Sequence, residues 1–201
     1  FLDFINGSLT LKGSVPYSMV YAGHQFGYFV PQLGDGRAIN LGSVNGWHLQ
    51  TKGSGLTRYS RSGDGRAVLR SSIREYLMSE AMHALGIPTT RALAIIDSDT
   101  FAHRDWEEES CSIVMRMSPS WIRVGTFEFF ARTKNKQAIF QLADYVIKQS
   151  YPHLENEENK YEKMFYSLVD KTAELLALWQ TYGFQHGVMN TDNFSMAGLT
   201  I

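Results

Sequence analysis

Lys52 and Glu75 are the first pair of residues in this chain whose types and spacing could do chemistry. Lys52 ends a run with strand character, and Glu75 lies in the helical pattern that follows, flanked by the apolar residues Ile73 and Tyr76. A strand lysine offers a fixed point charge to a phosphate group, and a helical glutamate keeps that long side chain in place. The pair predicts a phosphate-positioning site. A surface lysine and an exposed helix glutamate stay open as the alternative.

A polar loop at residues 185–193 has the spacing of a second chemical site. Protein kinases use His-Arg-Asp, four residues and then Asn, where Asp is the base and Asn binds a metal ion. When His186 is aligned with the kinase histidine, Asn193 falls on the metal ligand, but Val188 takes the position of the base. Asp192 offers another carboxylate next to Asn193. The loop predicts a kinase-like metal site without the kinase base, with a polar turn as the alternative.

A glycine-rich segment and two arginines could also hold phosphate. Residues 53–66 contain four glycines among polar side chains, and backbone N–H groups of such a loop can surround phosphate oxygens. The segment follows the Lys52 strand and is neither a Walker A motif nor a kinase Gly-x-Gly-x-x-Gly, so a flexible surface loop stays open. Arg116 and Arg123 could each bind phosphate through two N–H groups, or be ordinary surface arginines.

These residues need a scaffold of short strands followed by helices. Asn45-Gly46 is the strongest hairpin signal, and residues 107–109 read as an acidic turn. The expected strands are 37–41, 47–52, 91–96, 112–117 and 194–201, and the expected helices are 68–85, 136–149 and 161–182. The apolar face expected for the first helix consists of Leu69, Ile73, Leu77 and Ala81. The order predicts an α+β fold with two lobes, a strand-rich one over about 1–117 and the start of a helical one over about 118–201.

The composition limits the class of protein. The 201 residues carry 19 Lys and Arg against 20 Asp and Glu, which does not favour a globally basic nucleic-acid binder. The single cysteine, Cys111, excludes an internal disulfide framework and a cysteine-based zinc site, and it fits a reducing compartment. No apolar run is long enough for a membrane span, and no signal peptide opens the chain. The chain starts without Met and stops in an apolar run, so we expect a piece of a longer protein.

Several strings of the sequence together resemble the selenoprotein O family. They are YAGHQFG from Tyr21, PQLGDGRA from Pro31, the stretch from Lys52 to Glu75, and HGVMNTDN from His186. The resemblance covers nearly the whole chain and has several long parts. It implies a pseudokinase-like, protein-kinase-type fold that transfers AMP from ATP to Ser, Thr or Tyr hydroxyls of proteins, with the nucleotide flipped relative to kinases.

The same resemblance implies a role for each matching residue. Asp192 would be the general base, Asn193 a magnesium ligand, and Glu75 would orient Lys52 on the phosphates. The residues implied to bind the nucleotide are Gly34, Gly36, Arg37, Lys52, Asp64, Gly65, Arg116 and Arg123. The family's second metal ligand, an Asp expected directly after Ile201, lies outside this sequence.

The expected partners are ATP, Mg²⁺ or Mn²⁺, and protein substrates, with no nucleic acid and no membrane. The expected compartment is the cytoplasm of a bacterium, or the mitochondrion of a eukaryote, and not the secreted space. Two other functions stay open, an ATP-dependent phosphotransferase of the kinase-like fold and a non-catalytic nucleotide-binding module. Because one metal ligand and much of the family's length are outside this chain, we expect it alone to transfer AMP weakly or not at all.

Overall fold

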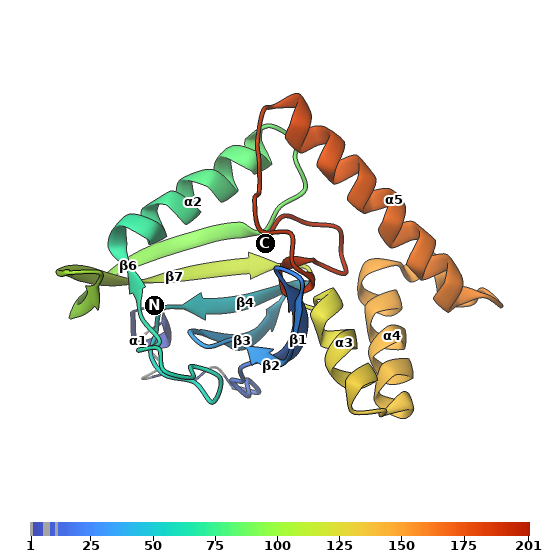
Figure 1. The fold of residues 1–201 in the computed structure, drawn as a ribbon, viewed down its shortest axis with the longest axis horizontal. Coiled ribbons are helices and arrows are strands. Elements are labelled where there is room, and N and C mark those ends of the chain that lie inside the picture. Colours follow the sequence, from blue (N-terminus) through green and yellow to red (C-terminus); the bar gives the residue numbers. More distant parts are fainter. Residues whose placement is uncertain (1, 6–8, 11) are drawn as a thin grey trace. The chain divides into compact units, whose positions relative to one another are not determined.

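The computed structural model describes residues 2–5, 9–10 and 12–201, which divide into two compact units (Figure 1). The first unit comprises Phe1–Met19, Gly34–Leu85 and Thr90–Ser118, and the second comprises Val20–Leu33, Gly86–Thr89 and Pro119–Ile201. The sequence places residues 20–33 in the strand-rich lobe, but they group with the second unit. Helices and antiparallel strands are both present, so the predicted α+β class is confirmed.

The first unit is built on a five-stranded sheet. Its elements are α1 (Leu2–Ile5), β3 (Ala38–Val44), β4 (Trp47–Lys52), β5 (Ala67–Val68), α2 (Leu69–Ala84), β6 (Arg91–Arg104) and β7 (Glu107–Ser118). The strand order is β3-β4-β7-β5, with β6 also paired to β7, and these pairs are antiparallel. Asn45 and Gly46 have φ values of 50° and 81° between β3 and β4, as a tight hairpin requires, so the predicted hairpin is confirmed.

The predicted acidic turn at residues 107–109 is wrong. β7 already begins at Glu107, and the turn lies at residues 105–106, so β6 continues to this turn instead of ending at residue 96. Glu109 is compensated within the strand because its carboxylate accepts hydrogen bonds from Nε and Nη2 of Arg70.

Helix α2 packs against β6 and β7, along one face of the sheet (Figure 1). The helix itself is confirmed, but its predicted buried face is wrong, since Ile73 and Leu77 are 43% and 61% exposed. Ser72 and Met82 are buried instead. A small residue such as Ser72 at the contact lets the helix lie close to the sheet, and the same face carries Glu75.

The second unit combines a hairpin with helices. Its elements are β1 (Val20–Gln25), β2 (Tyr28–Gly34, ending in the first unit), α3 (Val124–Arg132), α4 (Lys136–Ser150), η1 (Pro152–Leu154), α5 (Lys160–Thr181) and η2 (Thr191–Asn193). The helices expected at 136–149 and 161–182 are confirmed, whereas α3 was not predicted. The strand expected at 194–201 is wrong, because only Ser195 and Thr200 form isolated bridges there.

The core of the second unit lies between α4, η1 and α5. Val146, Ile147, Tyr151 and Leu168 are among its buried residues. The Tyr151 hydroxyl donates to the carbonyl of Met196 at 2.8 Å, which ties the segment after η2 to this core. Within the described residues, no helix is both long and apolar enough to cross a membrane.

Candidate active site

Lys52, Glu75 and Arg116 form one charged cluster in the first unit. Lys52 Nζ donates to Glu75 Oε2 at 2.5 Å, and Arg116 Nη1 donates to Glu75 Oε1 at 3.0 Å. Lys52 lies opposite Val114 of β7, and side chains two residues apart share a face of a strand, so Arg116 emerges beside it. The structure therefore forms the pair that the sequence predicts and adds an arginine to it.

A row of buried amides continues this cluster across the sheet. Arg116 Nη2 donates to Gln50 Oε1, Gln50 Nε2 donates to Asn40 Oδ1 at 3.2 Å, and Asn40 Nδ2 donates to Asp35 Oδ2 at 3.4 Å. All four residues are buried, and Gln50 is 0% exposed. A buried polar group that loses its partner costs about 1–3 kcal/mol, so the row holds the Arg116 guanidinium in one orientation.

The cluster shifts the ionisation of both Lys52 and Glu75. Burial lowers the pKa of Lys52 and the charge of Arg116 adds to this effect, so that the pKa falls to about 8 even though Glu75 acts in the opposite direction. Burial would raise the pKa of Glu75. The charges of Arg116 and Lys52 and their hydrogen bonds outweigh burial and lower that pKa to about 2. Glu75 is therefore an anion shared by two cations.

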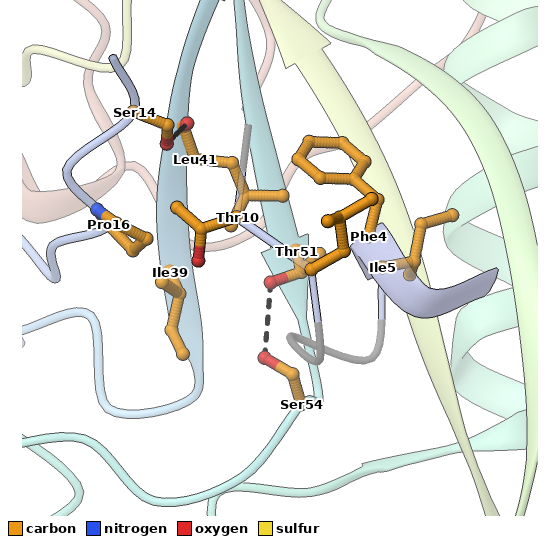
Figure 2. A pocket seen from close by; sticks show the side chains of 10 residues that line it. Phe4, Ile5, Thr10, Ser14, Pro16, Ile39, Leu41, Thr51 and Ser54 are labelled. Atoms are coloured by element: carbon orange, nitrogen blue, oxygen red, sulfur yellow. Dashed lines mark hydrogen bonds between the residues drawn. The ribbon is translucent and has the colours of Figure 1, made fainter. Parts of the chain in front are cut away.

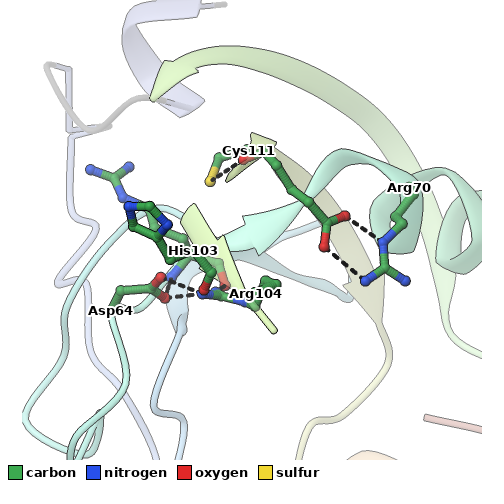
Figure 3. A network of polar contacts seen from close by, with 7 residues as sticks. Asp64, Arg70, His103, Arg104 and Cys111 are labelled. Carbon is green, nitrogen blue, oxygen red and sulfur yellow. Dashed lines mark hydrogen bonds and ion pairs between the residues drawn. The ribbon is translucent and has the colours of Figure 1, made fainter. Parts of the chain in front are cut away.

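Asp64, in the glycine-rich segment, pairs with Arg104 of β6 (Figure 3). Arg104 Nη1 donates to Asp64 Oδ2 at 2.7 Å and Nη2 donates to Oδ1 at 2.9 Å, while Arg66 N donates to Oδ1 at 2.9 Å. The hydrogen bonds from Arg104, helped by that from Arg66, lower the pKa of Asp64 to about 2. A Cβ at Gly65 would stand 2.1 Å from the carbonyl oxygen of Gly55, so the segment is closed on itself at this point.

Gly34 and Gly36 lie against Tyr59 of the same segment. A Cβ at Gly34 would stand 2.4 Å from Tyr59 Cγ, and one at Gly36 would stand 2.9 Å from the Tyr59 carbonyl oxygen. Both positions need glycine for this close approach. Arg37 is exposed, and its charge also contributes to the lowered pKa of Lys52, so it belongs to the field of the Lys52 cluster.

Asp192 lies in η2 of the second unit and is buried, with 7% of its surface exposed. Gln25 Nε2 donates to its Oδ2 at 2.9 Å, and its Oδ1 has no hydrogen-bond partner among the described residues. Two glycines permit this position. A Cβ at Gly23 would stand 3.0 Å from Asp192 Oδ1, and one at Gly125 would stand 2.1 Å from the Ala22 carbonyl oxygen and 3.3 Å from Asp192 Cα.

Arg123 and Asn193 both lie close to Asp192. Arg123 Nη1 donates to the Asp192 carbonyl at 2.7 Å, and its guanidinium carbon lies 4.7 Å from the centroid of the Tyr21 ring. Asn193 Nδ2 donates to the carbonyl of Val188 at 3.2 Å, which leaves the amide oxygen as its ligating atom. Because Arg123 is buried, its hydrogen bond to the Asp192 carbonyl is shielded from water and holds the backbone of η2.

Asp192 and Asn193 carry the type of donor atom that a magnesium ion prefers. Mg²⁺ takes hard oxygen ligands, and Asn193 and Asp192 supply an amide and a carboxylate on adjacent residues. Across residues 2–5, 9–10 and 12–201, no cluster of three or more His, Cys, Asp or Glu side chains could hold a metal ion. The described part of the chain thus offers few ligands to the ion.

The predicted residues fall into two groups, one in each unit. Arg37, Lys52, Glu75 and Arg116 form the first, and Arg123, Asp192 and Asn193 form the second. Asp64 has its described contacts with Arg104 and Arg66. Five polar residues of these groups were not predicted from the sequence. They are Asp35, Asn40, Gln50, Gln25 and also Glu128, which accepts a hydrogen bond from Thr191 beside Asp192. Asn40 and Gln50 carried a signal, because amides inside otherwise apolar strands need buried partners.

A separate hollow of about 230 Å³ lies on the first unit (Figure 2). Phe4 and Ile5 of α1 line it together with Leu41 of β3, and Thr51 and Ser54 contribute hydroxyl groups 3.1 Å apart. Its described lining contains none of the predicted site residues. Phe4, Ile5 and Leu41 also belong to the hydrophobic core of this unit, so the hollow is a feature of its packing.

A family model described as "Protein adenylyltransferase SelO" matches residues 2–201. The chain belongs to the SelO family. The resemblance seen in the sequence is thereby confirmed.

SelO relatives from three organisms align with the full length of the chain. Each is described as "Protein nucleotidyltransferase YdiU". The relative from Thioalkalivibrio sulfidiphilus (strain HL-EbGR7) is 54% identical over 206 residues, that from Myxococcus xanthus (strain DK1622) 52% over 206, and that from Thiobacillus denitrificans (strain ATCC 25259 / T1) 53% over 205. Each alignment covers 100% of this chain and 42% of the relative. The chain therefore spans less than half the length of these relatives.

Proposed function

We propose that the protein containing this chain is an adenylyltransferase that moves AMP from ATP to a Ser, Thr or Tyr hydroxyl of a protein substrate. We further propose that its catalytic domain is kinase-like, with a strand-rich lobe over about 1–117 and a helical lobe that begins at about 118. Membership of the SelO family and the printed names of the relatives support this proposal. The observation that carries it is the buried, fixed carboxylate of Asp192 in the loop where Val188 occupies the kinase base position.

The first unit supplies cations for the phosphates in this proposal. Lys52 is held by Glu75 and, like Arg116, is a fixed positive charge, which suits a triphosphate better than a mobile side chain would. Arg123 provides a further guanidinium in the second unit. The remaining proposed nucleotide contacts are Gly34, Gly36, Arg37, Asp64 and Gly65.

Asp192 is the proposed general base. It accepts the proton of the protein hydroxyl as the hydroxyl oxygen attacks the α-phosphorus of ATP. The new bond joins that oxygen to the α-phosphorus, and the bond between the α-phosphorus and the oxygen bridging to the β-phosphate breaks. Pyrophosphate leaves, and AMP remains on the substrate. When bound, a Mg²⁺ ion with Asn193 as a ligand would neutralise the charge of the phosphates.

The position of the label in ATP tests this proposal. The complete protein incubated with a protein substrate and α-labelled ATP should label the substrate, and γ-labelled ATP should not. Asp192→Asn should reduce the transfer by at least a hundredfold while ATP still binds. Label from the γ-phosphate alone would instead support the phosphotransferase, and binding without transfer of either label would support a non-catalytic module.

The expected setting follows from the same proposal. We propose the cytoplasm as the compartment of a bacterial protein of this kind, and the mitochondrion for a eukaryotic one, with ATP and proteins as partners. The single cysteine of this chain, Cys111, is buried.

A further inference from the structure

A short stretch of β1, Gly23–Gln25, holds the loop that carries Asp192. Gln25 Nε2 donates to Asp192 Oδ2 at 2.9 Å, and the backbone N–H of His24 donates to Thr191 Oγ1 at 3.0 Å. At Gly23 the backbone approaches so closely that an added Cβ would stand 3.0 Å from Asp192 Oδ1. Three consecutive residues of one strand thus contact the carboxylate or the residue before it.

Gln25 is the only described donor to this carboxylate, and it acts on one oxygen. Oδ1 is buried against Gly23 without a partner among the described residues, which leaves Oδ2 as the oxygen that Gln25 orients and that would meet the substrate hydroxyl in the proposed reaction. A carboxylate oxygen accepts more than one hydrogen bond, so Oδ2 can hold Gln25 and still take a proton. The terminal torsion of an aspartate is broad without such a partner, and the amide of Gln25 therefore sets the direction in which Oδ2 points.

A second set of contacts holds the segments that carry Gln25 and Asp192 next to each other. Thr191 Oγ1 donates to Glu128 Oε2 at 2.5 Å, and Glu128 Oε1 lies 2.9 Å from His24 Nδ1. Glu128 belongs to α3, so the start of η2 is tied both to β1 and to a helix. The geometry of the Gln25 hydrogen bond is thus imposed by the fold of this unit.

We propose that Gln25 is a positioning residue for Asp192 in the adenylyl transfer, and this inference rests on the function proposed above. Gln25 takes no part in bond making. It fixes Oδ2 as the oxygen that receives the proton of the protein hydroxyl. Hydrogen bonds to charged groups commonly contribute enough to change a rate about tenfold to a hundredfold.

Two substitutions of similar length separate this role from simple packing. Gln25→Met removes the donor, and Gln25→Glu puts a second carboxylate beside Asp192. In the complete protein, we expect single-turnover AMP transfer at saturating ATP to fall about tenfold for Gln25→Met and about a further tenfold for Gln25→Glu. The KM for ATP should change less than twofold. Gln141→Glu, the same change at an exposed position of α4, is the matched control and should leave the rate unchanged.

The background of Asp192→Asn decides whether Gln25 acts through Asp192. There, Gln25→Met should alter the residual rate less than twofold. The inference is overturned if both Gln25 variants transfer AMP at the wild-type rate while Asp192→Asn is inactive. It is also overturned if the Met and Glu variants lose transfer rate and ATP affinity equally, as a packing defect would cause. If the wild-type protein transfers no AMP, or Asp192→Asn keeps the wild-type rate, the proposed function fails and this inference fails with it.

Discussion

Raising the pH from 7.5 to 9 should weaken ATP binding by the complete protein about eightfold, because Lys52 loses its proton in this range. Burial, together with the charge of Arg116, lowers the pKa of Lys52 to about 8. About three-quarters of the molecules carry protonated Lys52 at pH 7.5 and about one-tenth at pH 9, and the ratio of these populations gives the factor of about eight. Protonated Lys52 is the form that attracts a triphosphate, so binding takes up protons and weakens as pH rises.

Isothermal titration calorimetry in buffers of different ionisation enthalpy measures both the affinity and the proton uptake. The last phosphate ionisation has a pKa near 6, so it is almost complete at pH 7.5. Lys52→Arg is the control, because a guanidinium stays charged throughout this range. Its affinity is expected to be lower at pH 7.5, where the compact ammonium fits Glu75, but independent of pH up to 9. A wild-type affinity that stays constant from pH 7.5 to 9 would refute the reasoning.

Two further predictions concern stability. Gln50→Leu removes the hydrogen bonds that the buried Gln50 amide makes to Arg116 and Asn40, so urea denaturation should show a loss of about 1–3 kcal/mol; an unchanged midpoint would mean that the amide row is not needed. Asp64→Asn weakens the pair with Arg104. The pKa of Asp64 in the folded protein is about 2, below the usual value of 3.8, so the wild-type protein should be more stable than the variant above pH 4. This difference in stability should disappear as the pH falls toward 2. Thermal melts at pH 6 and pH 2.5 check this, and an equal difference at both pH values would contradict it.

The sequence predicts the elements that have strong local signals. Asn45-Gly46 requires positive φ at both residues, and the helices at 136–149 and 161–182 have a clear apolar period, so these are confirmed. The prediction of the buried face of α2 was wrong because it used only the spacing of apolar residues. The face that packs on the sheet instead carries the small residue Ser72 and the anion of Glu75. The acidic start of β7 was also missed, since its stability in a strand depends on Arg70, 39 positions away.

In the candidate site, too, contacts between residues close in sequence could be predicted, whereas contacts between distant residues could not. Lys52 and Glu75 could be paired from the sequence because a strand and the next helix meet within 23 positions. The contact between Gln25 and Asp192 could not, because it joins residues 167 positions apart and follows from the packing of β1 against η2. The roles of the nucleotide-binding and metal-binding residues stay predictions.

The separation of 167 positions between Gln25 and Asp192 also sets an order of assembly during synthesis. The residues that surround Glu75 are all present once the chain reaches Ser118, the end of β7. At roughly 5–20 residues per second, about ten to thirty seconds pass between the synthesis of Gln25 and that of Asp192. A two-stranded hairpin is marginally stable alone, and β1 packs against both α3 and η2, so β1 gains its contact with α3 first and its contact with η2 only when residues 191–193 have been made. The ribosome therefore completes the cation cluster first and the proposed base last.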